Sequence, residues 1–93
     1  MKIGICGATG YSGREIVRIL LKHPDVTLSF LSSEQSAGQK ISDVFPEFRH
    51  RIDLVCHSLE SVTEKPDAQV VFLALPHSVS MKISKLFLEK GVR

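Results

Sequence analysis

The sequence has no long apolar run, and this absence excludes the usual kind of membrane-spanning helix. Such a helix needs roughly 18–20 consecutive apolar residues, whereas glycines interrupt the apolar start around Ile3 and Ile5. A signal-peptide pattern with a cleavage site is missing as well. The sequence therefore predicts a protein of the cytoplasm with no membrane partner.

Cysteine is scarce, and neither sign of charge is in excess. Cys6 and Cys56 lack the spacing of metal ligands, and both fall in apolar segments. This favours buried structural thiols over a metal site, a disulfide or catalysis. Twelve basic against ten acidic residues give a formal net charge of +2, which is too small to indicate nucleic-acid binding. The basic cluster at residues 49–51 is read as a solvated loop.

Repeats and low-complexity linkers are also missing, so the 93 residues predict one compact domain. The hydrophobic fraction of 43% and the charged fraction of 24% are ordinary for a globular protein. Both values argue against disorder.

What the chain does contain is a glycine-rich stretch between an apolar strand, expected over residues 2–6, and an amphipathic helix, expected over residues 14–22. The first glycine of such a stretch allows a tight turn, the second lets the backbone approach a pyrophosphate, and the third lets the helix pack closely. Ser12 and Glu15 have the spacing of a helix capping box. The alternative is a glycine-rich turn without a ligand. The predicted phosphate-binding residues are Gly7, Ala8, Thr9, Gly10, Tyr11, Ser12 and Gly13.

The remaining segments alternate between strand and helix patterns. Strands are expected over 26–31, 54–56 and 70–75. Helices are expected over 39–44 and after Ser78, which is the expected N-cap, with Gly91 just past the end of that helix. Residues 59–65 are either a loop or a single helical turn. This order predicts an α/β fold, a Rossmann-type doubly wound parallel sheet. The sheet is expected to be incomplete, because a fifth strand should begin after Arg93.

The end of the second strand bears on the choice of cofactor. NAD-selective sites carry an acidic residue about 20 residues past the glycine motif, and that count reaches Ser32 and Ser33. These neutral donors tolerate a 2′-phosphate and favour NADP. Glu34 is a counter-argument if it faces the ribose. Lys40 is either a phosphate ligand or a solvated surface lysine.

A second group of candidate residues follows the strongest predicted strand. Leu75, Pro76 and His77 stand at its carboxyl end, and open α/β sheets bind ligands outside the carboxyl ends of their strands. All three are predicted to bind the cofactor. His77 either lines the site near the nicotinamide or makes a structural hydrogen bond at the start of a helix.

Several segments together resemble N-acetyl-gamma-glutamyl-phosphate reductase, an NADP-dependent enzyme family of arginine biosynthesis. The matching segments are the glycine stretch and residues 23–24, 36–40, 42–46 and 71–80. The resemblance implies reduction of an acyl phosphate to N-acetyl-glutamate semialdehyde. In that reaction a cysteine thiolate displaces phosphate, and hydride from NADPH reduces the thioester.

The resemblance also implies how such a protein is divided. Residues 1–93 correspond to the dinucleotide-binding domain, and the nucleophilic cysteine and the substrate-binding residues belong to a larger domain that follows. No catalytic residue and no metal ligand is therefore expected in this chain, and the full-length protein is expected to be a homo-oligomer. The alternative function is a stand-alone nucleotide-binding module that acts as a redox sensor or interaction protein.

Overall fold

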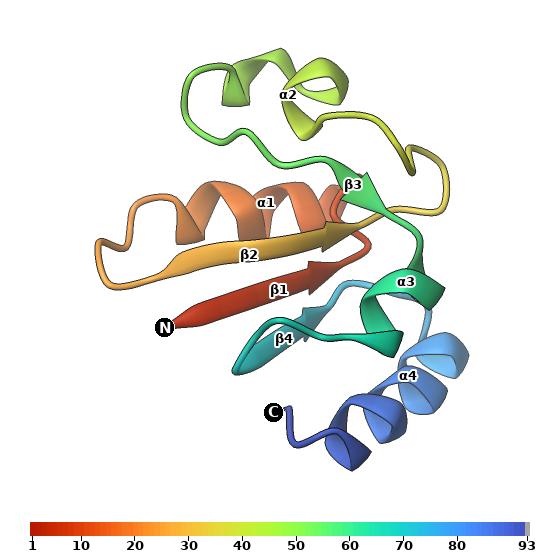
Figure 1. Ribbon diagram of the computed structural model, residues 1–93. Coiled ribbons are helices and arrows are strands. Elements are labelled where there is room, and N and C mark those ends of the chain that lie inside the picture. The colour runs from red at the N-terminus through yellow and green to blue at the C-terminus, as the bar shows by residue number, and fades with distance from the viewer. Residues whose placement is uncertain (93) are drawn as a thin grey trace.

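The sheet of this protein contains four parallel strands (Figure 1). The computed structural model describes residues 1–92, apart from the side chain of His77. The strand order is β3-β2-β1-β4, which matches the first four positions of the six-stranded Rossmann order. This confirms the predicted fold class, whereas the strand expected after Arg93 lies outside the described residues. The strands are β1 (Lys2–Cys6), β2 (Thr27–Ser32), β3 (Cys56–His57) and β4 (Val70–Leu73).

The helices cover both faces of the sheet, as a doubly wound fold requires. Figure 1 shows α1 and α2 on one side and α3 and α4 on the other. Among the helices within residues 1–92, none combines the length and the apolar character that crossing a membrane would take. The helices are α1 (Tyr11–Leu20), α2 (Ile41–Val44), α3 (Leu59–Glu64) and α4 (His77–Glu89), and a 3-10 turn, η1 (Pro46–Phe48), follows α2.

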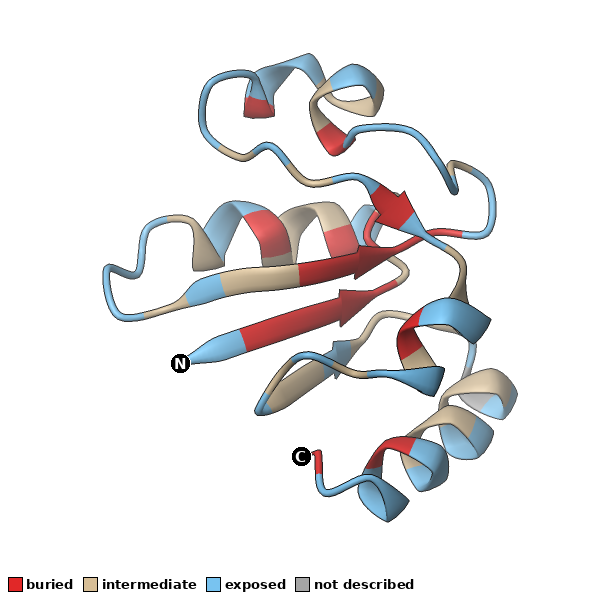
Figure 2. Cartoon of the chain, in the orientation of Figure 1, coloured by how far each residue is buried: buried red, intermediate tan, exposed pale blue. Residues whose placement is uncertain are grey.

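Two hydrophobic cores result from the alternation of side chains along the central strands. Ile5 and Leu31 are fully buried against Val17 of α1, on the face that also receives α2 and η1. The neighbouring Cys6 and Phe30 face the opposite core with Phe87 of α4. Figure 2 shows that the buried parts of β1 and β2 lie toward their carboxyl ends. The carboxyl ends of both strands, including the one from which the glycine turn leaves, are therefore covered on both faces.

The predicted side-chain caps of the two long helices are wrong. Helix α1 begins at Tyr11, three residues earlier than expected, with Gly10 as its N-cap and no side-chain cap bond. The glycine turn is tight enough to start the helix at once, so Ser12 already lies within it. Helix α4 likewise begins at His77 after Pro76, without a side-chain cap, so Ser78 is not the cap.

The other boundaries differ less from the predictions. The ambiguous segment 59–65 forms α3, because the Ser58 hydroxyl accepts a hydrogen bond from the Ser61 N–H at 3.2 Å and caps it. Strand β3 lies later than expected, at Cys56–His57. The predicted end of α4 at Gly91 is confirmed by bonds from the N–H groups of Gly91 and Val92 back into its last turn.

Candidate nucleotide-binding site

The turn between β1 and α1 is closed so tightly that two of its glycines have no room for a side chain. Gly7 has a positive φ of 82°, and a Cβ there would lie 2.3 Å from the Ala74 carbonyl oxygen. A Cβ on Gly13 would lie 2.0 Å from the Gly7 oxygen and 2.8 Å from the Ala8 Cα. Both contacts are with backbone, which cannot rotate away. The fold itself therefore requires glycine at positions 7 and 13.

Gly10 is different, because nothing within the described part of the protein requires it to be a glycine. Its φ is −74°, a Cβ there would come no closer than 3.5 Å to the Gly7 oxygen, and the residue is exposed. An α-helix leaves its first N–H groups without internal partners, and together with the helix dipole they favour an anion. A glycine at this N-cap leaves that helix end open to a ligand, so the site fits a phosphate group.

The carboxyl end of β2 holds the glycine turn in place. The Ser32 carbonyl oxygen accepts hydrogen bonds from the N–H groups of Gly7 and Ala8 at 3.1 and 2.9 Å. The Gly7 N–H also lies 3.3 Å from the Ser32 hydroxyl oxygen. Ser32 is only 2% exposed. Ser32 therefore lies beside the glycine turn with its hydroxyl already in contact with the protein, and its role as a cofactor ligand stays a prediction.

Ser33 extends this connection to Thr9. The two hydroxyl oxygens are 2.5 Å apart, and the Ser33 hydroxyl also accepts the Ser36 N–H at 3.1 Å. Ser33 is 3% exposed, whereas Thr9 is partly exposed. The side chain of Ser33 is thus buried and hydrogen-bonded to Thr9 and to the Ser36 N–H. The role of Ser33 as a cofactor ligand stays a prediction.

The turn after β4 lies against the glycine turn, as the prediction for residues 75–77 requires. A Cβ on Gly7 would be 3.1 Å from Leu75 Cδ2, and exposed Pro76 precedes the first residue of α4. Both turns leave the carboxyl ends of β1 and β4, between which the strand order reverses (Figure 1). Ligands of open α/β sheets bind at such a switch point. The predicted role of the His77 side chain lies outside the described residues.

Lys40 and Glu34 both contact other groups of the protein. Lys40 is exposed at the start of α2, with its Nζ 3.4 Å from Asp53 Oδ1. The Glu34 carboxylate accepts the Leu59 N–H at 2.8 Å, at the N-terminus of α3. Sequence reasoning missed this contact, because its partners are 25 residues apart and form no local pattern.

Arg14 is a second residue near the site that sequence reasoning missed. Its guanidinium donates to both carboxylate oxygens of Glu47 and lies 4.5 Å from the centroid of the Phe45 ring. The carboxylate raises the pKa of Arg14, and the guanidinium lowers the pKa of Glu47. Arg14 therefore fastens the segment around α2 and η1 to α1, and its charge is already paired.

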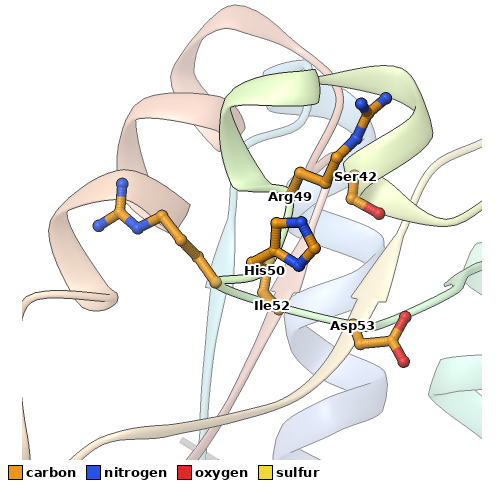
Figure 3. Close-up of a pocket in the computed structure, with 6 residues that line it drawn as sticks. Ser42, Arg49, His50, Ile52 and Asp53 are labelled. Carbon is orange, nitrogen blue, oxygen red and sulfur yellow. The ribbon is translucent and has the colours of Figure 1, made fainter.

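A separate cavity of about 410 Å³ lies beside α2 and η1, away from the glycine turn. Figure 3 shows the Arg49 side chain reaching toward Ser42 and away from the Asp53 carboxylate. The charged groups therefore do not converge on one point, and the predicted solvated loop remains the simpler description. The lining residues are Ser42, Arg49, His50, Arg51, Ile52 and Asp53.

Both cysteines are free and buried, as the sequence predicts. Burial raises the pKa of the Cys6 thiol to about 11, and a hydrogen bond with the Ser32 side chain offsets part of this rise. Burial also raises the pKa of Cys56. A nucleophilic cysteine needs a lowered pKa and access to solvent. Neither thiol fits that chemistry.

The raised pKa of Cys6 predicts a loss of stability at high pH. Because the folded-state pKa exceeds the ordinary value of 9.0, the contribution is fully present below pH 9 and is lost as the pH rises through 11. The two-unit shift corresponds to about 2–3 kcal/mol of unfolding free energy. Urea titrations of the chain and of Cys6→Ala at pH 8 and pH 11 measure it. Equal losses in the two proteins would contradict this assignment.

Comparison with known proteins shows the family to which the chain belongs. The family model described as "Semialdehyde dehydrogenase, NAD binding domain" matches residues 2–93. The chain belongs to this family. It is accordingly a nucleotide-binding domain of the semialdehyde dehydrogenase type, which confirms the function inferred from the glycine stretch.

Relatives of the chain include bacterial enzymes named N-acetyl-gamma-glutamyl-phosphate reductase. The protein from Citrifermentans bemidjiense is 44% identical over 91 residues, covering 98% of this chain and 26% of that protein. The one from Clostridium beijerinckii is 47% identical over 89 residues, covering 96% of this chain and 25% of that protein. The chain thus spans about a quarter of the length of these relatives, and the resemblance stated from the sequence is confirmed.

A solved structure shares the fold with higher sequence divergence. Aspartate semialdehyde dehydrogenase from Candida albicans, determined with NADP, superimposes with a TM-score of 0.79 at 32% identity. The match covers 98% of this chain and 27% of that one. That dehydrogenase therefore shares the arrangement of strands and helices seen in this chain.

Proposed function

We propose that the chain is the NADP-binding domain of an N-acetyl-gamma-glutamyl-phosphate reductase. The observation that carries this proposal is the glycine turn, which the fold needs at Gly7 and Gly13 but not at Gly10. The open helix end at Gly10 fits a pyrophosphate. The names of the relatives indicate reduction of an acyl phosphate. The family resemblance implies an aldehyde product and a place in arginine biosynthesis.

The residues of this chain would bind and orient the dinucleotide. The backbone of the glycine turn and the N-terminus of α1 would hold the pyrophosphate. The end of β2 and Lys40 would lie toward the adenosine ribose, and residues 75–77 toward the nicotinamide. When bound, the nicotinamide supplies hydride to the substrate. The nucleophile would come from another part of the full-length protein, since Cys6 and Cys56 are buried.

Two contacts support NADP rather than NAD. The Glu34 carboxylate accepts the Leu59 N–H, so one of its oxygens is already engaged at the N-terminus of α3. Lys40 is exposed and its partner Asp53 is exposed too, so exchange of this weak ion pair for a 2′-phosphate costs little. The neutral Ser32 and Ser33 place no like charge near that phosphate.

We expect the chain to bind NADP more tightly than NAD, and Lys40→Ala to weaken NADP binding roughly tenfold while leaving NAD binding unchanged. Loss of one charge-assisted hydrogen bond corresponds to a change of that size. Calorimetric titration with each nucleotide measures both values. Lys22→Ala is the matched control, because Lys22 follows α1 at the opposite end from the glycine turn.

Equal affinity of the unaltered chain for NADP and NAD would contradict the proposed cofactor, and absence of binding to either would contradict the proposed function. The reductase activity, the homo-oligomeric state and the cytoplasmic location belong to the proposal for the full-length protein. Turnover of the acyl phosphate by the 93-residue chain alone would contradict the proposal that the nucleophile lies in another part of the full-length protein.

A further inference from the structure

The hydroxyl groups of Thr9 and Ser33 form a link between the two places where a dinucleotide would contact the protein. Thr9 belongs to the glycine turn, and Ser33 directly follows β2. Their oxygens are 2.5 Å apart although the residues are 24 positions apart in the chain. A contact this short between two hydroxyls is a hydrogen bond in which one oxygen must donate and the other must accept.

The surroundings of Ser33 decide which hydroxyl donates. A serine hydroxyl has one proton and can accept two hydrogen bonds. The Ser33 oxygen accepts the Ser36 N–H at 3.1 Å, and a hydroxyl that accepts a bond becomes a stronger donor. Ser33 is 3% exposed, so its proton has little access to water. Donation to Thr9 therefore gives the buried Ser33 proton an acceptor.

The consequence falls on Thr9. Once Thr9 Oγ1 accepts the proton of Ser33, the proton of Thr9 itself has to find another acceptor. Thr9 is partly exposed and stands next to Gly10, at the open end of α1. An anion bound at that helix end would supply such an acceptor.

We propose that Ser33 is a positioning residue that acts through Thr9, and that Thr9 donates its hydroxyl proton to a pyrophosphate oxygen of the dinucleotide. This inference rests on the proposed nucleotide binding and changes the role of Ser33 within it. Ser33 then contributes equally to NAD and NADP binding. The hydrogen bonds run in one direction, from the Ser36 N–H through Ser33 and Thr9 to the phosphate.

Three ligands separate this role from direct recognition of the 2′-phosphate. NADP carries both the pyrophosphate and the 2′-phosphate, NAD only the pyrophosphate, and adenosine 2′-monophosphate only the 2′-phosphate. Ser33→Ala and Thr9→Val are each expected to weaken NADP and NAD binding equally, by roughly fivefold, the effect of one lost hydrogen bond. Neither change should alter binding of adenosine 2′-monophosphate.

Variants of the pair test whether the two residues act as one unit. The double variant Thr9→Val/Ser33→Ala should bind NADP about as weakly as either single variant, because the removed contact is shared. Thr9→Ser keeps the hydroxyl and should restore the affinity, which a purely steric role of Thr9 would not allow. Ser58→Ala is the matched control: it removes the cap of α3, lowers stability and should leave all three affinities unchanged.

Each other outcome overturns the inference. If Ser33→Ala weakens NADP and adenosine 2′-monophosphate but not NAD, Ser33 is a direct ligand of the 2′-phosphate. If Ser33→Ala changes no affinity while circular dichroism shows a folded chain, the hydroxyl pair has no part in binding. If the unaltered folded chain binds none of the three ligands, the proposed function fails, and this inference fails with it.

Discussion

Gly13→Ala is expected to destabilise the protein by about 3–5 kcal/mol, a large part of the stability of a domain of this size. The added Cβ would lie 2.0 Å from the Gly7 carbonyl oxygen and 2.8 Å from the Ala8 Cα. Relief requires α1 to move away from the strand end, and Val17 of α1 is fully buried in the core that would open. Urea unfolding followed by far-UV circular dichroism measures the loss.

Gly38→Ala is the control for the glycine-to-alanine change itself. Gly38 has a positive φ of 90°, but a Cβ there meets nothing within 4 Å. Its replacement should therefore cost only about 1–2 kcal/mol, the price of a left-handed conformation for alanine. A Gly13→Ala variant that is as stable as Gly38→Ala would show that the turn can open without cost, contrary to the packing described here.

Gly10→Ala is expected to separate binding from stability. The new methyl group would come no closer than 3.5 Å to the protein, so the unfolding free energy should change by about 1 kcal/mol or less, mainly because alanine is a poor N-cap. Nucleotide affinity should fall on the order of 10- to 100-fold, because the methyl group occupies the surface that a pyrophosphate approaches. Calorimetric titration with NADP on the folded variant measures the change.

The effect of Gly10→Ala should be the same for NADP and NAD, since both carry the pyrophosphate. Lys40→Ala, by contrast, should change NADP binding alone. Unchanged affinity in Gly10→Ala would mean that the phosphates do not bind at the N-terminus of α1. Such a result would contradict the proposed site while leaving the family membership intact.

The errors of the sequence-based predictions concentrate at helix starts. Ser12 and Ser78 have the right chemistry for an N-cap, but α1 and α4 both begin before them. A tight turn or a proline can begin a helix without a side-chain cap. The capping pattern in the sequence does not reveal this, because a serine of suitable spacing is present whether or not it caps the helix. Ser58, which was not predicted as a cap, does cap α3.

The sequence by itself determined the α/β order, the buried strands, the buried thiols and the glycine turn between β1 and α1. These features follow from local rules, since hydrophobic periodicity and the steric freedom of glycine are properties of neighbouring residues. Only the tertiary structure decided which polar side chains remain available to a ligand. Thr9 meets Ser33 across 24 positions, Glu34 meets Leu59 across 25, and Arg14 meets Glu47 across 33. No local pattern encodes such pairs, because they form only when the folded sheet brings the ends of its strands together.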